Sequence, residues 1–116
     1  MIHGRLPARA ADDMAEYLGV SKNVVFGVLD TPESTAHRLI RDGRRLDSAA
    51  SERVLRVAEI VREAEEAFGG RPAALRWLKS VNLALGGATP LSLLDTAVGA
   101  AQVRRVLSAI SHGGAF

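Results

Sequence analysis

The sequence contains no cysteine, few aromatic residues and little excess of one charge. Without cysteine the chain can form neither a disulfide nor a thiolate metal site. The aromatic residues are one tryptophan, one tyrosine and three phenylalanines, and the formal net charge of +2 is too small to indicate a nucleic-acid partner by itself. A length of 116 residues suits one domain of common size, or two small lobes that share a core.

Long apolar runs are also missing. The longest uncharged stretch, residues 80–94, contains Asn82, two glycines and Pro90, and it is too short and too interrupted to span a bilayer. The first six residues lack the apolar run of a signal peptide. We therefore expect a soluble, cytoplasmic protein that does not associate with membranes.

The usual motifs of catalysis and cofactor binding are absent from the sequence. His3, His37 and His112 are far apart, and none belongs to a metal-binding pair at i, i+4 spacing. Neither a Gly-x-Gly-x-x-Gly run nor a P-loop occurs. We therefore expect no enzymatic activity, no cofactor and no metal site.

What the sequence does contain is alanine, leucine, arginine and glutamate, a composition that favours helices. Residues 9–18 place apolar side chains at helical spacing and stop at Gly19. Ser21 suits the N-cap of a short second helix. Because residues 24–28 include three valines, a strand stays open as an alternative for this segment.

Two further helices have strong start signals. Thr31 as N-cap with proline next to it predicts a helix over residues 32–41. Asp47 or Ser48 is predicted to cap a long helix over residues 48–68. One predicted apolar stripe of this long helix contains Val54, Val57, Ala58, Val61, Ala64 and Phe68.

Beyond Gly69 the sequence has fewer charges and more glycine. A helix is predicted from Arg71, then a turn-rich connection over residues 82–88, a second Thr-Pro start signal, and a last helix capped by Asp95 or Thr96. The last helix is predicted to turn inward Val103, Val106, Leu107 and Ile110. We therefore expect an all-α protein: a helix-turn-helix-like bundle over residues 1–62 and a small helical lobe over residues 63–116, joined by the long helix.

The strongest local signal is residues 20–46. A short helix, a tight turn and a second helix with polar residues facing outward are typical of a helix-turn-helix. Hydroxyls and amides at the start of the second helix can contact phosphates or base edges, and arginines can neutralise phosphates or read guanine. The candidate DNA-binding residues are Ser34, Thr35, His37, Arg38, Arg41, Arg44 and Arg45. A solvated helical face followed by an arginine-rich loop stays open as an alternative.

The second signal is the apolar C-terminal part. Trp77 and Leu78 fit a core position, Asn82 fits a helix end, and the glycines fit turns. A lobe of this size cannot bury all of its leucines: Leu83, Leu85, Leu91, Leu93 and Leu94. Some of them are therefore expected to face a partner.

Taken in this order, the residues resemble the Xre/MbcA/ParS antitoxin family, whose members are paired with RES-domain toxins. The resemblance covers about residues 18–116 and is most specific in a set of spaced matches: Trp77-Leu78, Asn82, residues 84–87, residues 89–91, Gly99 and Gly113. Val81 departs from the family, which usually has proline there. We expect this change to loosen the turn without abolishing it.

The resemblance implies a division of labour between the lobes. The C-terminal lobe would bind a RES-domain toxin and block its NAD-handling pocket, so NAD would belong to the toxin. The N-terminal lobe would dimerise and let the complex bind operator DNA and repress its own operon. The implied toxin-binding residues are Trp77, Asn82, Leu85, Gly86, Arg104, His112, Gly113, Gly114, Ala115 and Phe116.

The end of the chain has two interpretations. The resemblance implies that His112 to Phe116 lies near the entrance of the toxin's active site, where Phe116 would act as a plug. The residues by themselves are equally typical of a loose tail. Two other function classes also stay open: a stand-alone helix-turn-helix transcriptional regulator, and an interaction module with a degenerate helix-turn-helix.

Overall fold

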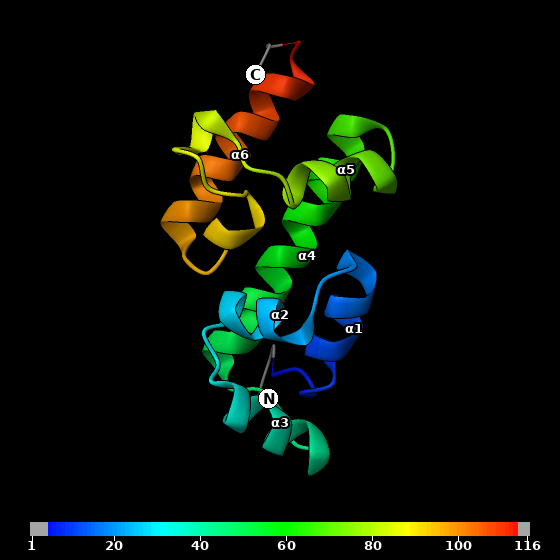
Figure 1. The fold of residues 1–116 in the computed structure, drawn as a ribbon, viewed down its shortest axis with the longest axis vertical. Helices are drawn as coiled ribbons and strands as arrows, with labels where there is room; N and C mark the ends of the chain where they lie inside the picture. The colour runs from blue at the N-terminus through cyan, green and yellow to red at the C-terminus, as the bar shows by residue number, and fades with distance from the viewer. Residues whose placement is uncertain (1–4, 114–116) are drawn as a thin grey trace. The chain divides into compact units, whose positions relative to one another are not determined.

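Helices dominate the computed structural model, which describes residues 5–113 (Figure 1). The elements are α1 (Ala10–Leu18), α2 (Lys22–Val28), α3 (Glu33–Arg41), α4 (Ser48–Phe68), α5 (Arg71–Leu78), the 3-10 helices η1 (Leu83–Leu85) and η2 (Leu91–Leu93), and α6 (Ala97–Ser111). Within residues 5–113 there is no strand, and β pairing is limited to isolated bridges. The predicted all-α class is confirmed. No helix in this range is both long enough and apolar enough to cross a membrane.

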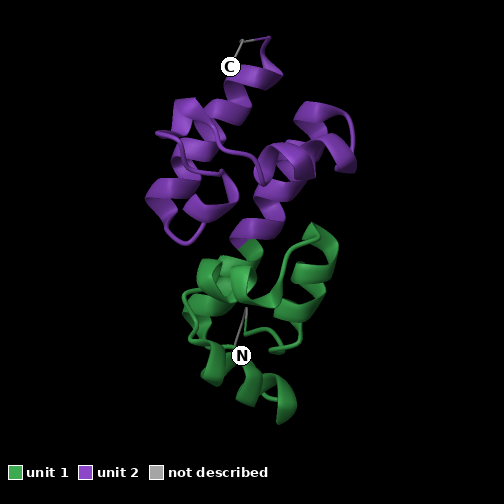
Figure 2. Cartoon of the chain, viewed as in Figure 1, with its two compact units in different colours: residues 1–55 green, residues 56–116 purple. Residues whose placement is uncertain are grey.

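The chain divides into two compact units, residues 1–55 (unit 1) and residues 56–116 (unit 2) (Figure 2). Helix α4 begins in unit 1 and continues into unit 2. The division of function at residue 62, which we expected from the sequence, stays a prediction.

Unit 1 is built on a small core in which α1 packs against α2 and α2 packs against α3. Phe26, Leu29 and Leu46 are almost completely buried in this core. The fully buried Ser51 of α4 accepts a hydrogen bond from the backbone N–H of Leu6 at 2.9 Å. This bond satisfies a backbone donor and fixes the segment before α1 on the first turn of α4.

The start of α2 follows the prediction, whereas the start of α3 does not. The Ser21 side chain accepts a hydrogen bond from Val24 N–H at 3.3 Å, and the valine-rich segment is a helix rather than a strand. The prediction of Thr31 as N-cap of α3 was wrong. Pro32 occupies that position, because its carbonyl accepts the N–H of Ala36 at 2.9 Å, while the Thr31 hydroxyl donates to Leu29 O.

Helix α4 is capped as predicted, but its buried face is rotated from the predicted stripe. Asp47 Oδ1 accepts the N–H of Ala50 at 2.8 Å. Most of the predicted stripe is buried or half-buried, but Ala58 is exposed and Ile60 is fully buried. At about 100° per residue, Ala58 and Ile60 lie on opposite edges of the buried face, each about 80° from its middle.

Unit 2 packs α6 against the irregular segment that contains η1 and η2. Leu78, Leu94 and Val103 are fully buried, and Ile110, which was predicted to be buried, is half-buried. Of the two predicted caps of α6, the structure uses Thr96, whose hydroxyl accepts the N–H of Gly99 at 3.0 Å.

Gly99 lets η2 and α6 come into close contact. A β-carbon at this position would clash with the carbonyl oxygen of Leu93, the last residue of η2. We predict that Gly99→Ala lowers the free energy of unfolding by about 3 kcal/mol, because the backbone of η2 would have to move. Urea unfolding measures the effect, followed by circular dichroism and by the fluorescence of Trp77, the single tryptophan of the chain.

Gly27→Ala is the matched control for this change. Gly27 lies inside α2, and a β-carbon there would meet no atom within 4 Å. Alanine favours the helix by about 1 kcal/mol over glycine, so this variant should be as stable as the wild type or more so. Equal destabilisation by both substitutions would contradict the role given to Gly99.

Candidate functional site

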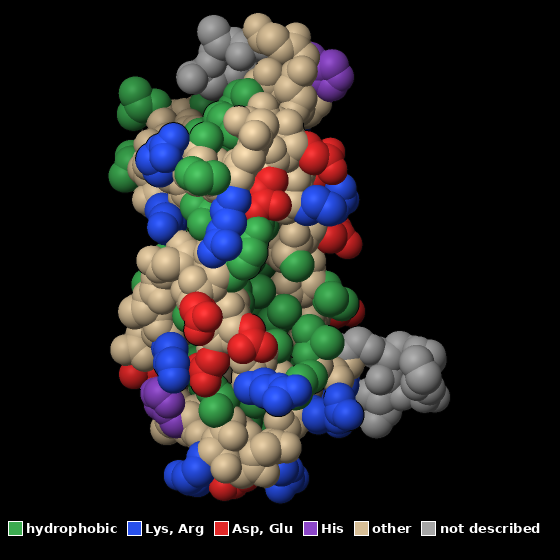
Figure 3. All heavy atoms as spheres, turned by 90° about the vertical axis from the view of Figure 1, so that its right-hand side faces the viewer, with side chains coloured by type: hydrophobic (Ala, Val, Ile, Leu, Met, Phe, Trp, Pro, Cys, Tyr) green, Lys and Arg blue, Asp and Glu red, His purple; other side chains and the backbone are tan. Residues whose placement is uncertain are grey.

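The predicted DNA-binding residues on α3 form an exposed polar face. Ser34, Arg38 and Arg41 are exposed and lie at i, i+4 and i+7, so they share one side of the helix. In Figure 3, Lys and Arg side chains lie to the left and right at the bottom of the view, where Figure 1 places α3. The other two predicted DNA-binding residues of α3 are Thr35 and His37. Thr35 is half-buried, and the His37 ring packs edge-to-face on the buried Phe26 at a centroid distance of 5.2 Å.

Arg45, which follows α3, and Arg41, the last residue of α3, both have partners within unit 1. Arg45 donates from Nη1 to the carbonyl of Arg5 at 2.9 Å, next to the bridge between Pro7 and Arg45. Arg5 in turn donates from Nε to Leu46 O at 3.1 Å. These two guanidinium groups therefore hold the segment before α1 against the segment after α3. Arg41 lies beside the Asp42 carboxylate at 3.2 Å.

Sequence reasoning missed Arg9. Arg9 and Arg44 line the same small hollow of unit 1, of about 190 Å³, together with Gly43 and Ile40. Neither guanidinium has a hydrogen bond or ion pair with any of residues 5–113. The bridge between the two segments brings these arginines together, and no local pattern in the sequence could have indicated it.

In unit 2, Asn82 organises the predicted turn. Its Oδ1 accepts the N–H of Ala84 at 2.8 Å, and its carbonyl accepts the N–H groups of Leu85 and Gly87, each at 3.0 Å. Its own N–H donates to Ala88 O at 3.0 Å. The turn thus forms although Val81 replaces the proline that is usual in the resembled family. The contribution of Asn82 is to hold the backbone of this turn in place.

The turn displays apolar side chains to solvent, as the sequence predicted for part of the leucine set. Leu83 is 90% exposed and Val81 is 68% exposed, whereas Leu91 and Leu94 are buried. Leu85 is half-buried. On the face of unit 2 shown in Figure 3, hydrophobic side chains reach the surface among Lys and Arg side chains. An exposed apolar surface of this kind is typical of a site that a partner covers.

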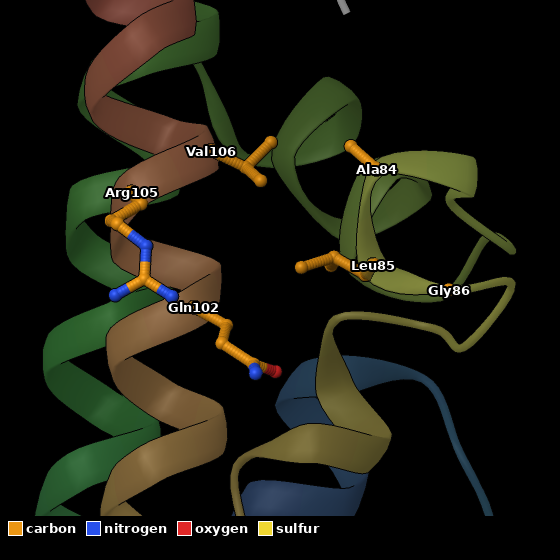
Figure 4. Close-up of a pocket in the computed structure, with 6 residues that line it drawn as sticks. All are labelled: Ala84, Leu85, Gly86, Gln102, Arg105 and Val106. Atoms are coloured by element: carbon orange, nitrogen blue, oxygen red, sulfur yellow. The ribbon is translucent and has the colours of Figure 1, made fainter.

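A hollow of about 350 Å³ lies between this turn and α6 (Figure 4). From the turn, Leu85 points toward α6, and from α6, Val106 and Gln102 point toward the turn. Gly86 and Arg105 complete the lining with Ala84. Gly86 adopts φ +70°, a left-handed conformation that glycine permits at low cost.

Adjacent arginines of α6 have different surroundings. Arg104 donates from Nη2 to Glu59 at 2.9 Å and from Nε to Glu63 at 3.1 Å, and it thereby links α6 to α4 within unit 2. Arg105 is exposed and has no hydrogen bond or ion pair with the described residues. Arg104, which the resemblance implied as toxin-binding, is thus engaged inside the unit. Arg105, which sequence reasoning missed, is available.

The other implied toxin-binding residues are spread over unit 2. Trp77 is half-buried in α5, with its ring 5.5 Å from that of Phe68. His112 ends α6, where its Nδ1 lies 2.7 Å from Ser108 O, and Gly113 follows with φ +83°. Gly114, Ala115 and Phe116 lie outside the described residues. Among residues 5–113, no cluster of His, Asp or Glu could hold a metal ion.

Two family models match the chain over most of its length. Residues 1–59 match the antitoxin Xre-like helix-turn-helix domain, and residues 63–113 match the antitoxin Xre/MbcA/ParS C-terminal toxin-binding domain. The chain belongs to the Xre/MbcA/ParS antitoxin family. The predicted resemblance is thereby confirmed, and the N-terminal match, to a helix-turn-helix domain, covers α2 and α3.

Curated proteins that are similar to this chain are also named antitoxins. The Prs ADP-ribosylating antitoxin of Sphingobium sp. is 31% identical, over 90% of this chain and 73% of that protein. An antitoxin Xre of Photorhabdus laumondii is 26% identical, over 93% of this chain and 74% of the relative. A second antitoxin Xre, from Pseudomonas putida, is 34% identical, over 71% of this chain and 52% of the relative.

The contacts of Arg104 and Arg105 predict different effects on the stability of the antitoxin. Arg104→Ala should lower the free energy of unfolding by about 1 kcal/mol, because one cation bridges two carboxylates that would otherwise repel each other. Arg105→Ala should leave it within about 0.5 kcal/mol of the wild type. Urea unfolding at low and high salt measures both effects, and the loss in Arg104→Ala should shrink at high salt. Equal stability of the two variants would contradict the assignment.

Proposed function

We propose that this antitoxin binds a RES-domain toxin through unit 2 and neutralises it by covering its NAD-handling pocket. The observation that carries the proposal is the exposed apolar turn at Leu83, which lies within the region matched by the toxin-binding family model. The ADP-ribosylation in the name of the Sphingobium relative supports a partner that uses NAD, because NAD is the donor of ADP-ribose. The antitoxin itself would need neither a cofactor nor catalytic residues.

The second part of the proposal is that unit 1 binds operator DNA and represses the antitoxin's own operon. The exposed face of α3 with Ser34, Arg38 and Arg41 would enter the major groove. Arg9 and Arg44 would contact a backbone phosphate, which positions the protein without reading sequence. A homodimer would present two recognition helices to two half-sites.

We place the functional division near residue 62, with DNA binding and dimerisation before it and toxin binding after it. Arg45 is the weaker member of the predicted DNA-binding set, because its guanidinium already donates to Arg5 O. The roles of Gly114, Ala115 and Phe116 near the toxin's active-site entrance rest on the resemblance. A cytoplasmic location follows from a function that requires operator DNA.

Neutralisation tests the first part of the proposal. Co-expression of the antitoxin with the RES-domain protein encoded by the neighbouring gene should restore growth, and Leu83→Asp should abolish the rescue by placing a charge in an apolar contact. Val98→Asp is the control, because Val98 is 73% exposed on α6 and is not part of the turn. Continued toxicity with folded wild-type antitoxin would overturn the proposal, and DNA binding without neutralisation would favour a stand-alone regulator.

DNA binding tests the second part. The double variant Arg38→Ala/Arg41→Ala should bind the promoter fragment of its own operon at least tenfold more weakly, because each lost base or phosphate contact costs about 1–3 kcal/mol. Arg9→Ala should lower the slope of log K against log salt by about 0.9, as expected for one lost phosphate contact. Fluorescence anisotropy over a salt series measures both quantities.

Arg62→Ala is the control for charge alone in the DNA experiment, since Arg62 is an exposed arginine of unit 2 paired with Glu66. All these variants should still neutralise the toxin. Loss of neutralisation in a folded Arg38→Ala/Arg41→Ala variant would contradict the division between the units. Binding that does not depend on salt would contradict a DNA role for the basic face.

A further inference from the structure

We propose that the hollow between the η1 turn and α6 takes an acidic side chain of the partner toxin, with Arg105 as its ion-pair partner. The proposal rests on the proposed toxin-neutralising function and names the chemistry by which unit 2 recognises its partner. Arg105 would thus be a specificity-determining residue of the antitoxin.

The lining of the hollow suits a short carboxylic side chain. Leu85, Val106 and Ala84 provide apolar surface for its methylene groups. Gln102, which points toward the turn, and Arg105, whose side chain lies along α6, provide donors for its carboxylate (Figure 4). A guanidinium has five N–H donors in a fixed fork that matches a carboxylate with two parallel hydrogen bonds. The volume of about 350 Å³ lies at the lower end of the range for ligand pockets, which suits a side chain rather than a large cofactor.

Among residues 5–113, no carboxylate pairs with Arg105. The two glutamates of α4 that pair with α6, Glu59 and Glu63, both bind Arg104. Arg105, one residue further along, makes no hydrogen bond or ion pair within residues 5–113. This guanidinium is therefore available to an acidic group of a partner.

The surroundings of the hollow would strengthen such an ion pair. Leu83 is 90% exposed and Val81 is 68% exposed on the same turn, so a partner seated on them would exclude water from the neighbouring charge pair. Charged pairs at the centre of an interface contribute most when a ring of apolar contacts keeps water away. The turn is also held in place by the hydrogen bonds of Asn82, which lowers the entropy lost on binding.

The test is a set of affinity measurements by calorimetry on the full antitoxin, with a catalytically inactive RES-domain protein encoded by the neighbouring gene as the probe. Arg105→Ala and Arg105→Glu should weaken binding by at least about 30-fold, the threshold of an interface hot spot. Arg105→Lys should recover only part of the affinity, because an ammonium cannot form two parallel hydrogen bonds. Arg76→Ala should change the affinity less than threefold, because Arg76 is an exposed arginine of α5 whose guanidinium has no partner among the described residues.

A charge reversal identifies the partner group. Among variants of the toxin in which one surface Asp or Glu is changed to Arg, one should restore binding to Arg105→Glu while it weakens binding to the wild type. Inorganic phosphate at millimolar concentration should not compete, which separates an acidic side chain from a free-anion site. Circular dichroism should show unchanged folding, because the Arg105 guanidinium makes no hydrogen bond or ion pair within residues 5–113.

The outcomes separate the two proposals. If the wild-type antitoxin does not bind the RES-domain protein, the proposed function and this inference both fail. If the wild type binds and the Arg105 variants bind equally well, only the inference fails. Competition by phosphate, or the absence of any rescuing toxin variant, would also overturn it.

Discussion

The architecture of unit 2 depends on the close contact between η2 and α6 at Gly99. A β-carbon at this position would clash with Leu93 O, so the contact exists only because the residue has no side chain. The Thr96 cap starts α6 at the same place, and Arg56 donates to the carbonyl of Leu94, the residue after η2, at 3.1 Å. With η2 held in this way, the preceding turn packs on α6, exposes Leu83 and leaves the hollow lined by Leu85 and Arg105.

Contacts divide the arginines of the antitoxin into two groups. Arg5, Arg45 and Arg104 use their guanidinium groups inside the fold, on backbone carbonyls or on the carboxylates of α4. Arg9, Arg44 and Arg105 have no such contacts with the described residues, and each lines a hollow. Taking a guanidinium away from its partner inside the fold costs free energy. An unpaired, exposed guanidinium is instead available for a phosphate or a carboxylate. The first group stabilises the fold, and the second group, together with Arg38 and Arg41 of α3, lies on the surfaces for which we propose functions.

Sequence reasoning was most successful where the signal was local. Ser21, Asp47 and Thr96 cap their helices as predicted, because a cap involves a side chain and an amide three residues away. The errors arose where two neighbouring candidates compete for one position. Pro32 rather than Thr31 begins α3, because the Pro32 carbonyl makes the first helical hydrogen bond while the Thr31 hydroxyl bonds to Leu29 O. Ile60 rather than Ala58 is buried, although both lie at the edge of the buried face, so periodicity alone does not decide between them.

The sequence by itself determined the all-α class, most helix boundaries and the family, since these follow from periodicity, capping residues and an ordered set of spaced motifs. It also indicated that a lobe of this size would leave leucines exposed. Only the tertiary structure decided which leucine is exposed, and which of the adjacent residues Arg104 and Arg105 is engaged. It alone brought Arg9 beside Arg44. The physical reason is that these properties depend on tertiary contacts, such as Arg104 with Glu59 or the packing of the turn on α6, for which the chain carries no local signal.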